Sequence, residues 1–175
     1  AATFRAINRL FKLKLSNETL ADMGADLGAD IPFCIHSKPC IARGKGEQLF
    51  FLDRKLKLPV LLVTPNIQVP TKKVYQAVDV SKVPKVKITS MTNAIYNNNY
   101  SLFTREAHNA LEQFAFGLYP EIKELKASLK AYDPDLVLMS GSGPTMMVFD
   151  KDRKLLERIA RDHYETHRVN LTKTL

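Results

Sequence analysis

The chain has 175 residues, of which 45% are hydrophobic and 25% charged, and its formal net charge is +8. This length allows one substantial core or two small lobes, and the composition is ordinary for a globular protein, which excludes any special compositional class. The longest apolar runs have strand length, far short of the roughly 20 residues that span a bilayer, and so predict no membrane crossing.

The positive charge favours anionic partners through the long-range field. Nucleic acid is one such class, but the lysines are dispersed along the chain, with no run of five basic residues and no aromatic RNA-binding signature among them. Dispersed charge is typical of a solvated surface. We therefore expect no nucleic-acid partner.

Helical periodicity opens the chain, because Phe4, Ile7 and Leu10 fall on one face of residues 1–11. Neither an initiator Met nor a targeting segment precedes this helix, and the beginning reads as a truncation. A second helix is predicted over residues 17–27, closed near Gly28.

Strands and helices then alternate. Short apolar runs between polar or glycine-bearing turns predict strands over residues 31–35, 40–42, 48–52 and 58–64. Helical spacing returns from Thr71, and the remainder predicts helices over residues 102–116, 121–132 and 151–164 with strands over residues 135–139 and 145–149. Helices packed on one face of a small sheet indicate an α+β class.

Asp30 lies in a small-residue turn between the second helix and an apolar run, a setting that suits a positioned general base. The alternative is an ordinary turn aspartate that accepts hydrogen bonds from nearby backbone N–H groups. Ser140, Gly141, Ser142 and Gly143 form a glycine and hydroxyl turn between two apolar runs, which leaves backbone N–H groups free to face an anion. A plain strand–turn–strand is the alternative here. Together the two features favour phosphoryl chemistry.

The cysteines give a weaker signal. Cys34, His36 and Cys40 would share one face of a continuous strand and could then bind a metal, but Pro39 argues against that continuity. Two ordinary thiols in a reducing compartment are the simpler interpretation, and we predict no metal site there. The same holds for two histidines, His163 and His167, in the polar tail.

A set of motifs, taken in order, resembles the GHMP kinases over essentially the whole chain. The motifs are Ala1-Ala2-Thr3, Leu27-Gly28-Ala29-Asp30-Ile31-Pro32-Phe33, Gly44-Lys45-Gly46-Glu47, Val69-Pro70-Thr71 with Tyr75, Asn109-Ala110-Leu111-Glu112, Tyr119-Pro120-Glu121 and Ser140-Gly141-Ser142-Gly143-Pro144-Thr145. The resemblance implies a two-lobed fold, with an incomplete amino-terminal lobe over residues 1–64 and a carboxy-terminal lobe over residues 65–175. The glycine-rich phosphate loop of the family would precede Ala1, and the missing segment is an expected partner.

The resemblance also implies an activity. It is transfer of the ATP γ-phosphate, with Mg²⁺, to the 2-hydroxyl of a cytidine-diphospho-methylerythritol on the non-mevalonate route to isoprenoid precursors. Asp30 matches the catalytic aspartate of the family, and the turn from Ser140 to Gly143 lies near the phosphates.

Thr71 and Tyr75 lie one helical turn apart, so both can face one cleft. The resemblance assigns Tyr75 to stacking on the cytosine ring and Thr71 to a polar contact with the same substrate. The alternative for Tyr75 is a core aromatic. For the chain as a whole, another GHMP small-molecule kinase and a non-catalytic nucleotide-binding protein stay open. A cytoplasmic location is expected, or a plastid for a plant or algal source.

Overall fold

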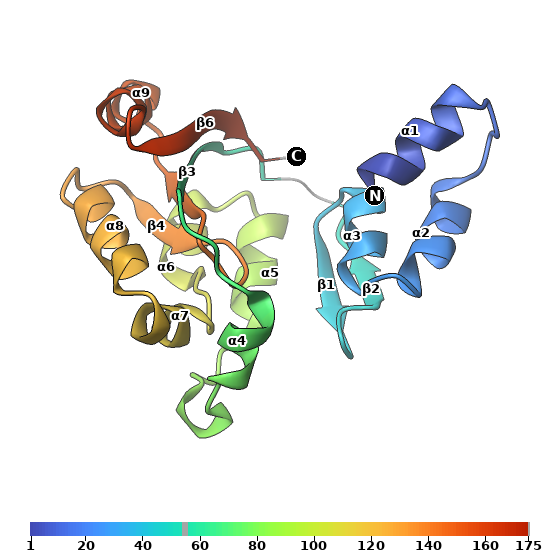
Figure 1. Cartoon of the computed structure of the whole chain (residues 1–175), viewed down its shortest axis with the longest axis horizontal. Helices are drawn as coiled ribbons and strands as arrows, with labels where there is room; N and C mark the ends of the chain where they lie inside the picture. The colour runs from blue at the N-terminus through green and yellow to red at the C-terminus, as the bar shows by residue number, and fades with distance from the viewer. Residues whose placement is uncertain (54–55, 175) are drawn as a thin grey trace. The chain divides into compact units, whose positions relative to one another are not determined.

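A computed structural model describes residues 1–53 and 56–174. The chain forms two compact units, an amino-terminal unit described up to Asp53 and a carboxy-terminal unit over residues 56–174 (Figure 1). The units divide earlier in the chain than the predicted lobe boundary after residue 64, because the strand that precedes this boundary belongs to the sheet of the second unit. The assignment of the units to kinase lobes stays a prediction.

The amino-terminal unit is built from three helices and a hairpin. It contains α1 (Ala2–Leu10), α2 (Asn17–Ala25), α3 (Asp30–His36), β1 (Cys40–Arg43) and β2 (Gln48–Phe51). Ser16 caps α2 by accepting a 3.1 Å hydrogen bond from the Thr19 N–H. The small core of this unit holds Leu20 and Ile35.

The prediction of a strand over residues 31–35 is wrong, since these residues form α3. An apolar run of five residues fits either element, and here Ile31 and Ile35 lie one helical turn apart and face α2. A side chain at Gly24 of α2 would collide with Ile31, so glycine at this position lets the two helices approach closely. Pro32 is tolerated because it lies in the first helical turn.

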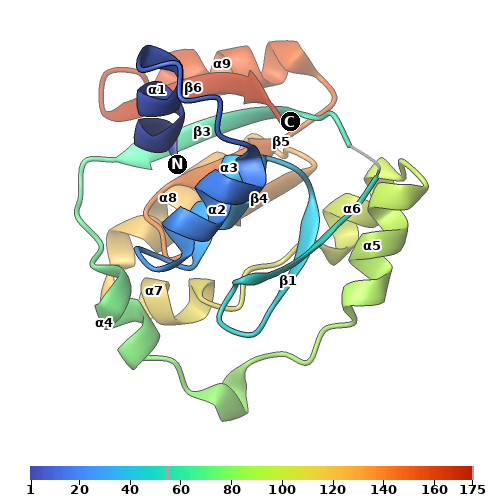
Figure 2. The same cartoon turned by 90° about the vertical axis from the view of Figure 1, so that its right-hand side faces the viewer.

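The carboxy-terminal unit contains a four-stranded antiparallel sheet in the order β4-β5-β3-β6. Its elements are β3 (Pro59–Pro65), α4 (Thr71–Gln76), a 3₁₀ turn (Val80–Lys82), α5 (Ile88–Tyr96), α6 (Tyr100–Glu106), α7 (Glu112–Leu118), α8 (Pro120–Lys130), β4 (Leu136–Met139), β5 (Met146–Phe149), α9 (Arg153–His163) and β6 (His167–Lys173). Figure 2 shows β6 beside β3, with α9 running along it. The helix α5 and the strand β6 were not predicted from the sequence.

Alternation along the strands separates two faces of this sheet. On one face Leu61, Val63 and Val148 are buried in the main core, together with residues of α8 and α9. On the other face Val60 and Phe149 belong to a smaller cluster that α6 covers with Phe103, whose ring meets that of Phe149 at 5.3 Å. The α+β prediction is confirmed, and the smaller cluster adds a helix on the second face.

The helix predicted over residues 102–116 is interrupted. It is present as α6 and α7, separated by residues 107–111, where Ala107 adopts an extended backbone. The side chain of Asn109 lies in this break and accepts a 2.9 Å hydrogen bond from the Leu111 N–H. In the described parts of the chain, no helix is both long and apolar enough to cross a membrane.

Candidate active site

Asp30 is the first residue of α3 in the amino-terminal unit, and its side chain is exposed. The chain reaches it through a short turn after α2, in which the Gly28 carbonyl accepts a 3.0 Å hydrogen bond from the Ile31 N–H. A carboxylate in the first helical turn is favoured by the helix dipole. The structure therefore holds Asp30 at a fixed backbone position with its carboxylate open to solvent.

The β1–β2 turn passes beside Asp30. A Cβ atom added at Gly46 would lie 3.9 Å from Asp30 Oδ1, and the φ of +109° at this residue favours glycine. In the same turn the Lys45 N–H donates a 2.6 Å hydrogen bond to Glu47 Oε2. Backbone N–H groups of Glu47 and Lys45 lower the pKa of the Glu47 carboxyl. The Gly44-Lys45-Gly46-Glu47 motif thus forms a small polar surface next to the candidate base.

The turn from Ser140 to Gly143 connects β4 to β5 in the carboxy-terminal unit. The Ser140 N–H donates to the Thr145 carbonyl at 2.8 Å, and the Gly143 N–H donates to the Ser140 carbonyl at 2.9 Å. Gly141 has a φ of +54° and Gly143 a φ of +88°, values that glycine adopts without strain. The two glycines therefore make the tight reversal possible.

Two backbone donors of this turn are unpaired within the described residues of its unit. Within residues 56–174, the N–H groups of Gly141 and Ser142 have no hydrogen-bond partner. Gly141 is exposed and Ser142 half-buried, so both N–H groups can bind a ligand rather than being sealed inside the unit. Successive free N–H groups in such a turn form a concave anion-binding surface. Its use by a phosphate stays a prediction.

The helix α4 lies against this turn. Thr71, its first residue, lies 2.9 Å from Ser142 through the two hydroxyl oxygens. Tyr75, one helical turn further, is 61% exposed, whereas Val74 beside it is fully buried. The core interpretation of Tyr75 is therefore wrong, and its ring is free for stacking. The structure brings Thr71 and the turn together, while Asp30 belongs to the other unit.

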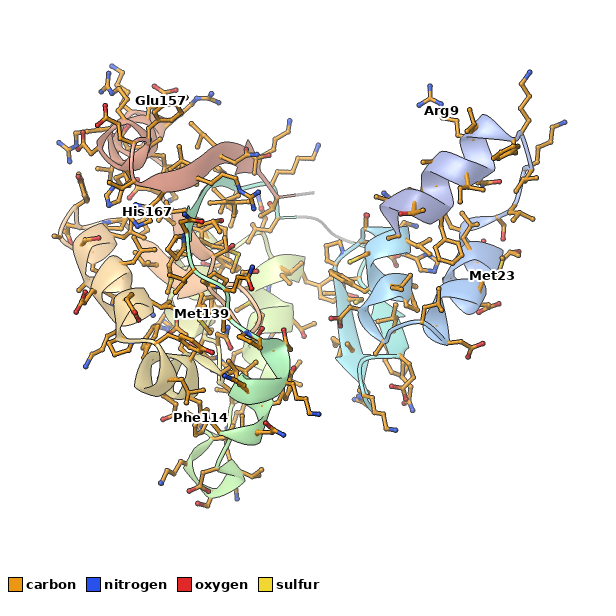
Figure 3. All side chains as sticks on the ribbon, in the orientation of Figure 1. Arg9, Met23, Phe114, Met139, Glu157 and His167 are labelled. Carbon is orange, nitrogen blue, oxygen red and sulfur yellow. The ribbon has the colours of Figure 1, made fainter. Side chains whose placement is uncertain are left out.

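A polar cluster that includes Asn109 and Glu112 lies beneath the turn. In the sequence these residues are part of a motif and have no predicted function. Asn109 Nδ2 donates to the carbonyl of Met139 at 2.8 Å and to that of Gly141 at 2.7 Å. Glu112 Oε1 accepts the Met139 N–H at 2.7 Å, and both Glu112 oxygens pair with Lys126 Nζ at 2.6 and 2.7 Å. Met139 is labelled in Figure 3. These side chains hold the end of β4, from which the turn departs.

The alternative in which Cys34, His36 and Cys40 share one strand face is excluded, because the first two residues lie on α3 and the third on β1. Both thiols are free, and burial raises the pKa of Cys40. The histidines His163 and His167 have ring centroids 5.6 Å apart at the α9–β6 junction. Over the described ranges 1–53 and 56–174, no three His, Cys, Asp or Glu side chains gather to hold a metal ion.

Comparison with known proteins places this geometry in a family. The family model described as GHMP kinases C terminal matches residues 91–168. The chain is 36% identical over 159 residues to 4-diphosphocytidyl-2-C-methyl-D-erythritol kinase of Geobacillus sp. (strain WCH70), a match that covers 91% of this chain and 55% of that protein. The chain thus spans about half the length of the curated relatives it matches.

Solved structures give the same result. A crystal structure of 4-(cytidine 5'-diphospho)-2C-methyl-D-erythritol kinase has a TM-score of 0.77 and 28% identity, covering 96% of this chain and 60% of that one. Homoserine kinase from Cytophaga hutchinsonii shares the fold, with a TM-score of 0.70, 16% identity, and coverage of 97% of this chain and 61% of that one. Residues 91–168 of the carboxy-terminal unit therefore belong to the C-terminal domain of the GHMP kinases.

Proposed function

We propose that this chain is part of an ATP-dependent kinase that phosphorylates the 2-hydroxyl of 4-diphosphocytidyl-2-C-methyl-D-erythritol, a step in isoprenoid precursor synthesis. The observation that carries the proposal is the 36% identity over 91% of the chain to a relative with that name. The bacterial origin of this relative favours a cytoplasmic reaction. The exposed Asp30 carboxylate and the N–H groups of Gly141 and Ser142 supply chemistry that suits this reaction.

Asp30 is the proposed general base. A hydroxyl group becomes an effective nucleophile when a carboxylate within hydrogen-bond reach accepts its proton, a contribution of about 10² to 10⁴ in rate. The Asp30 side chain is exposed and free to accept such a bond, and glycine at position 46 leaves space beside it. The alternative role is that of a turn aspartate whose carboxylate accepts hydrogen bonds from backbone N–H groups. Within residues 1–53, no backbone N–H donates a hydrogen bond to the Asp30 carboxylate.

The carboxy-terminal unit supplies anion and base recognition in this proposal. The N–H groups of Gly141 and Ser142 suit phosphate oxygens, which accept strong charge-assisted hydrogen bonds. The exposed ring of Tyr75 suits stacking on cytosine, with the Thr71 hydroxyl nearby for a polar contact. These residues bind and orient the reactants, and orientation contributes more to the rate than proton transfer does.

Magnesium fits the proposal as an ion carried by the nucleotide. In kinase sites Mg²⁺ is bound largely by substrate phosphates and water, with one or two carboxylates, rather than by an all-protein cage. When bound, the ion neutralises charge that develops on the transferred phosphoryl group.

The test is phosphoryl transfer from Mg-ATP to the cytidine-diphospho substrate, followed by the mass of the product. It is run on the chain and on a chimaera that adds the region of the Geobacillus relative that this chain does not cover. We expect the chimaera to form product and its Asp30→Asn variant to lose activity by about 10² or more. Asp26→Asn, which changes an exposed carboxylate just before α3, is the matched control and should keep activity.

Other outcomes separate the alternatives. Transfer to a mevalonate-like or amino-alcohol substrate in preference to the cytidine compound would indicate another small-molecule kinase. Binding of a cytidine diphosphate ligand without turnover, in the chimaera as well as in the chain, would indicate a non-catalytic nucleotide-binding protein. Equal activity in the Asp30→Asn and Asp26→Asn variants would refute the role of Asp30.

A further inference from the structure

The direction of the Ser142 N–H is fixed by a hydrogen bond on the far side of its own peptide group. The Gly141 carbonyl and the Ser142 N–H belong to one trans peptide, which is planar, so they point in opposite directions. The Gly141 carbonyl accepts a 2.7 Å hydrogen bond from Asn109 Nδ2. Because Asn109 holds the carbonyl on the inner side of the turn, the N–H is turned outward.

The same side chain anchors the start of the turn. Asn109 Nδ2 also donates to the Met139 carbonyl at 2.8 Å, and the next N–H, that of Ser140, is directed to Thr145. The Asn109 amide is itself fixed, since its Oδ1 accepts the Leu111 N–H at 2.9 Å. The Nδ2 donor, with its two hydrogen bonds, and the Oδ1 acceptor are therefore both set by backbone contacts, which leaves the side chain one orientation.

We propose that Asn109 is a positioning residue that aims the Ser142 N–H, with that of Gly141 beside it, at a phosphate group of the bound reactants. Asn109 does not touch the phosphate in this arrangement; it acts through the Gly141–Ser142 peptide. Only the identity of the phosphate compound rests on the kinase function proposed above. The anion-binding geometry depends on contacts inside the carboxy-terminal unit alone.

The experiment follows the backbone amides of the ¹⁵N-labelled chain by NMR during a titration with inorganic pyrophosphate, at constant ionic strength. In the unmodified chain the Gly141 and Ser142 amides should shift with a saturable dependence on pyrophosphate. In Asn109→Ala the affinity should fall by about tenfold, as expected for loss of one oriented charge-assisted hydrogen bond.

Two further variants separate positioning from stability. Asn109→Ser keeps a neutral hydroxyl that can accept the Leu111 N–H but lacks the amide donor, so it should lose affinity as Asn109→Ala does. Ile159→Val trims a fully buried side chain of α9 and controls for a general loss of stability, and it should bind pyrophosphate normally.

The proposal is overturned if pyrophosphate does not shift the Ser142 amide of the unmodified chain. It is also overturned if Asn109→Ser binds as tightly as the unmodified chain, because the cap at Leu111 would then be the only function of Asn109. A chain that binds pyrophosphate as expected, while the chimaera transfers no phosphoryl group, would refute the kinase function and support the role of Asn109.

Discussion

The two glycines of the β4–β5 turn allow a matched test of its geometry. At Gly143 the φ is +88°, and a Cβ atom would lie 2.9 Å from Met139 Sδ and 3.6 Å from Ile122 Cδ1. At Gly141 the φ is +54°, and a Cβ atom would meet no heavy atom within 4 Å. Alanine at either position strains the backbone, but only alanine at position 143 also presses on the core, because Met139 and Ile122 are buried.

The expected costs follow from these two terms. A left-handed backbone costs an L-residue about 1 to 2 kcal/mol, and both variants carry this term. Overpacking of a buried contact adds about 1 to 3 kcal/mol, toward the low end where a flexible methionine can move. We expect Gly141→Ala to lower the free energy of unfolding by about 1 to 2 kcal/mol and Gly143→Ala by about 2 to 5 kcal/mol. Entropy that alanine removes from the unfolded chain is common to both variants and cancels in the difference.

Urea unfolding followed by far-UV circular dichroism measures the difference, provided that the slope with urea is unchanged between the two variants. The chain contains no tryptophan, so tyrosine fluorescence serves as the second probe. If the two variants agree within about 0.5 kcal/mol, which is the usual scatter of harmless surface changes, the close packing of Gly143 on Met139 is refuted.

Two further predictions concern the same unit. Glu112→Gln keeps an acceptor for the Met139 N–H but leaves Lys126, whose side chain is 15% exposed, without its countercharge. The variant should therefore lower the free energy of unfolding by about 2 to 3 kcal/mol. Adding Lys126→Met should recover part of this loss in a double-mutant cycle by urea unfolding. For His167, burial and then a neighbouring histidine lower the pKa below its ordinary value of 6.5. The unfolded chain therefore binds more protons than the folded chain between the two pKa values. The free energy of unfolding should be highest above pH 6.5 and should fall as the pH drops through the folded pKa, and it should fall less steeply in His167→Gln. An equal pH dependence of unfolding in the two proteins would contradict this.

Elements with a strong local pattern could be predicted from the sequence. The continuous apolar runs of β3 and β5 reflect burial on both faces of the sheet, and the periodicity of α8 reflects burial of one helix face. The strand β6 left a weaker trace, because its residues are at most half-buried. The segment of α3 was misassigned because its apolar residues fit two periods, and only packing on α2 decides between them.

The candidate site likewise has features that local sequence patterns predict and features that they do not. The turn from Ser140 to Gly143 could be predicted, because glycine and hydroxyl residues between apolar runs indicate a reversal of the chain without any long-range contact. The roles of Asn109 and Glu112 could not, since the backbone groups of β4 and the turn that they contact lie 27 to 32 residues further along the chain. No local pattern encodes such a contact. Its signal in the sequence was the motif Asn109-Ala110-Leu111-Glu112, which gave the residues without their function.

The prediction of one continuous helix over residues 102–116 is wrong because of the same contacts that shape the β4–β5 turn. Residues on both sides of Asn109 have helical spacing, and a continuous helix would direct its side chain according to the helix surface alone. In the structure the Asn109 amide instead serves three backbone groups, those of Met139, Gly141 and Leu111. The bonds to Met139 and Leu111 are partly buried, where an unpaired backbone group would be costly. The interruption of the helix therefore places the Asn109 amide beneath the turn. The local sequence pattern of either segment, the helix or the turn, cannot predict the contact between them.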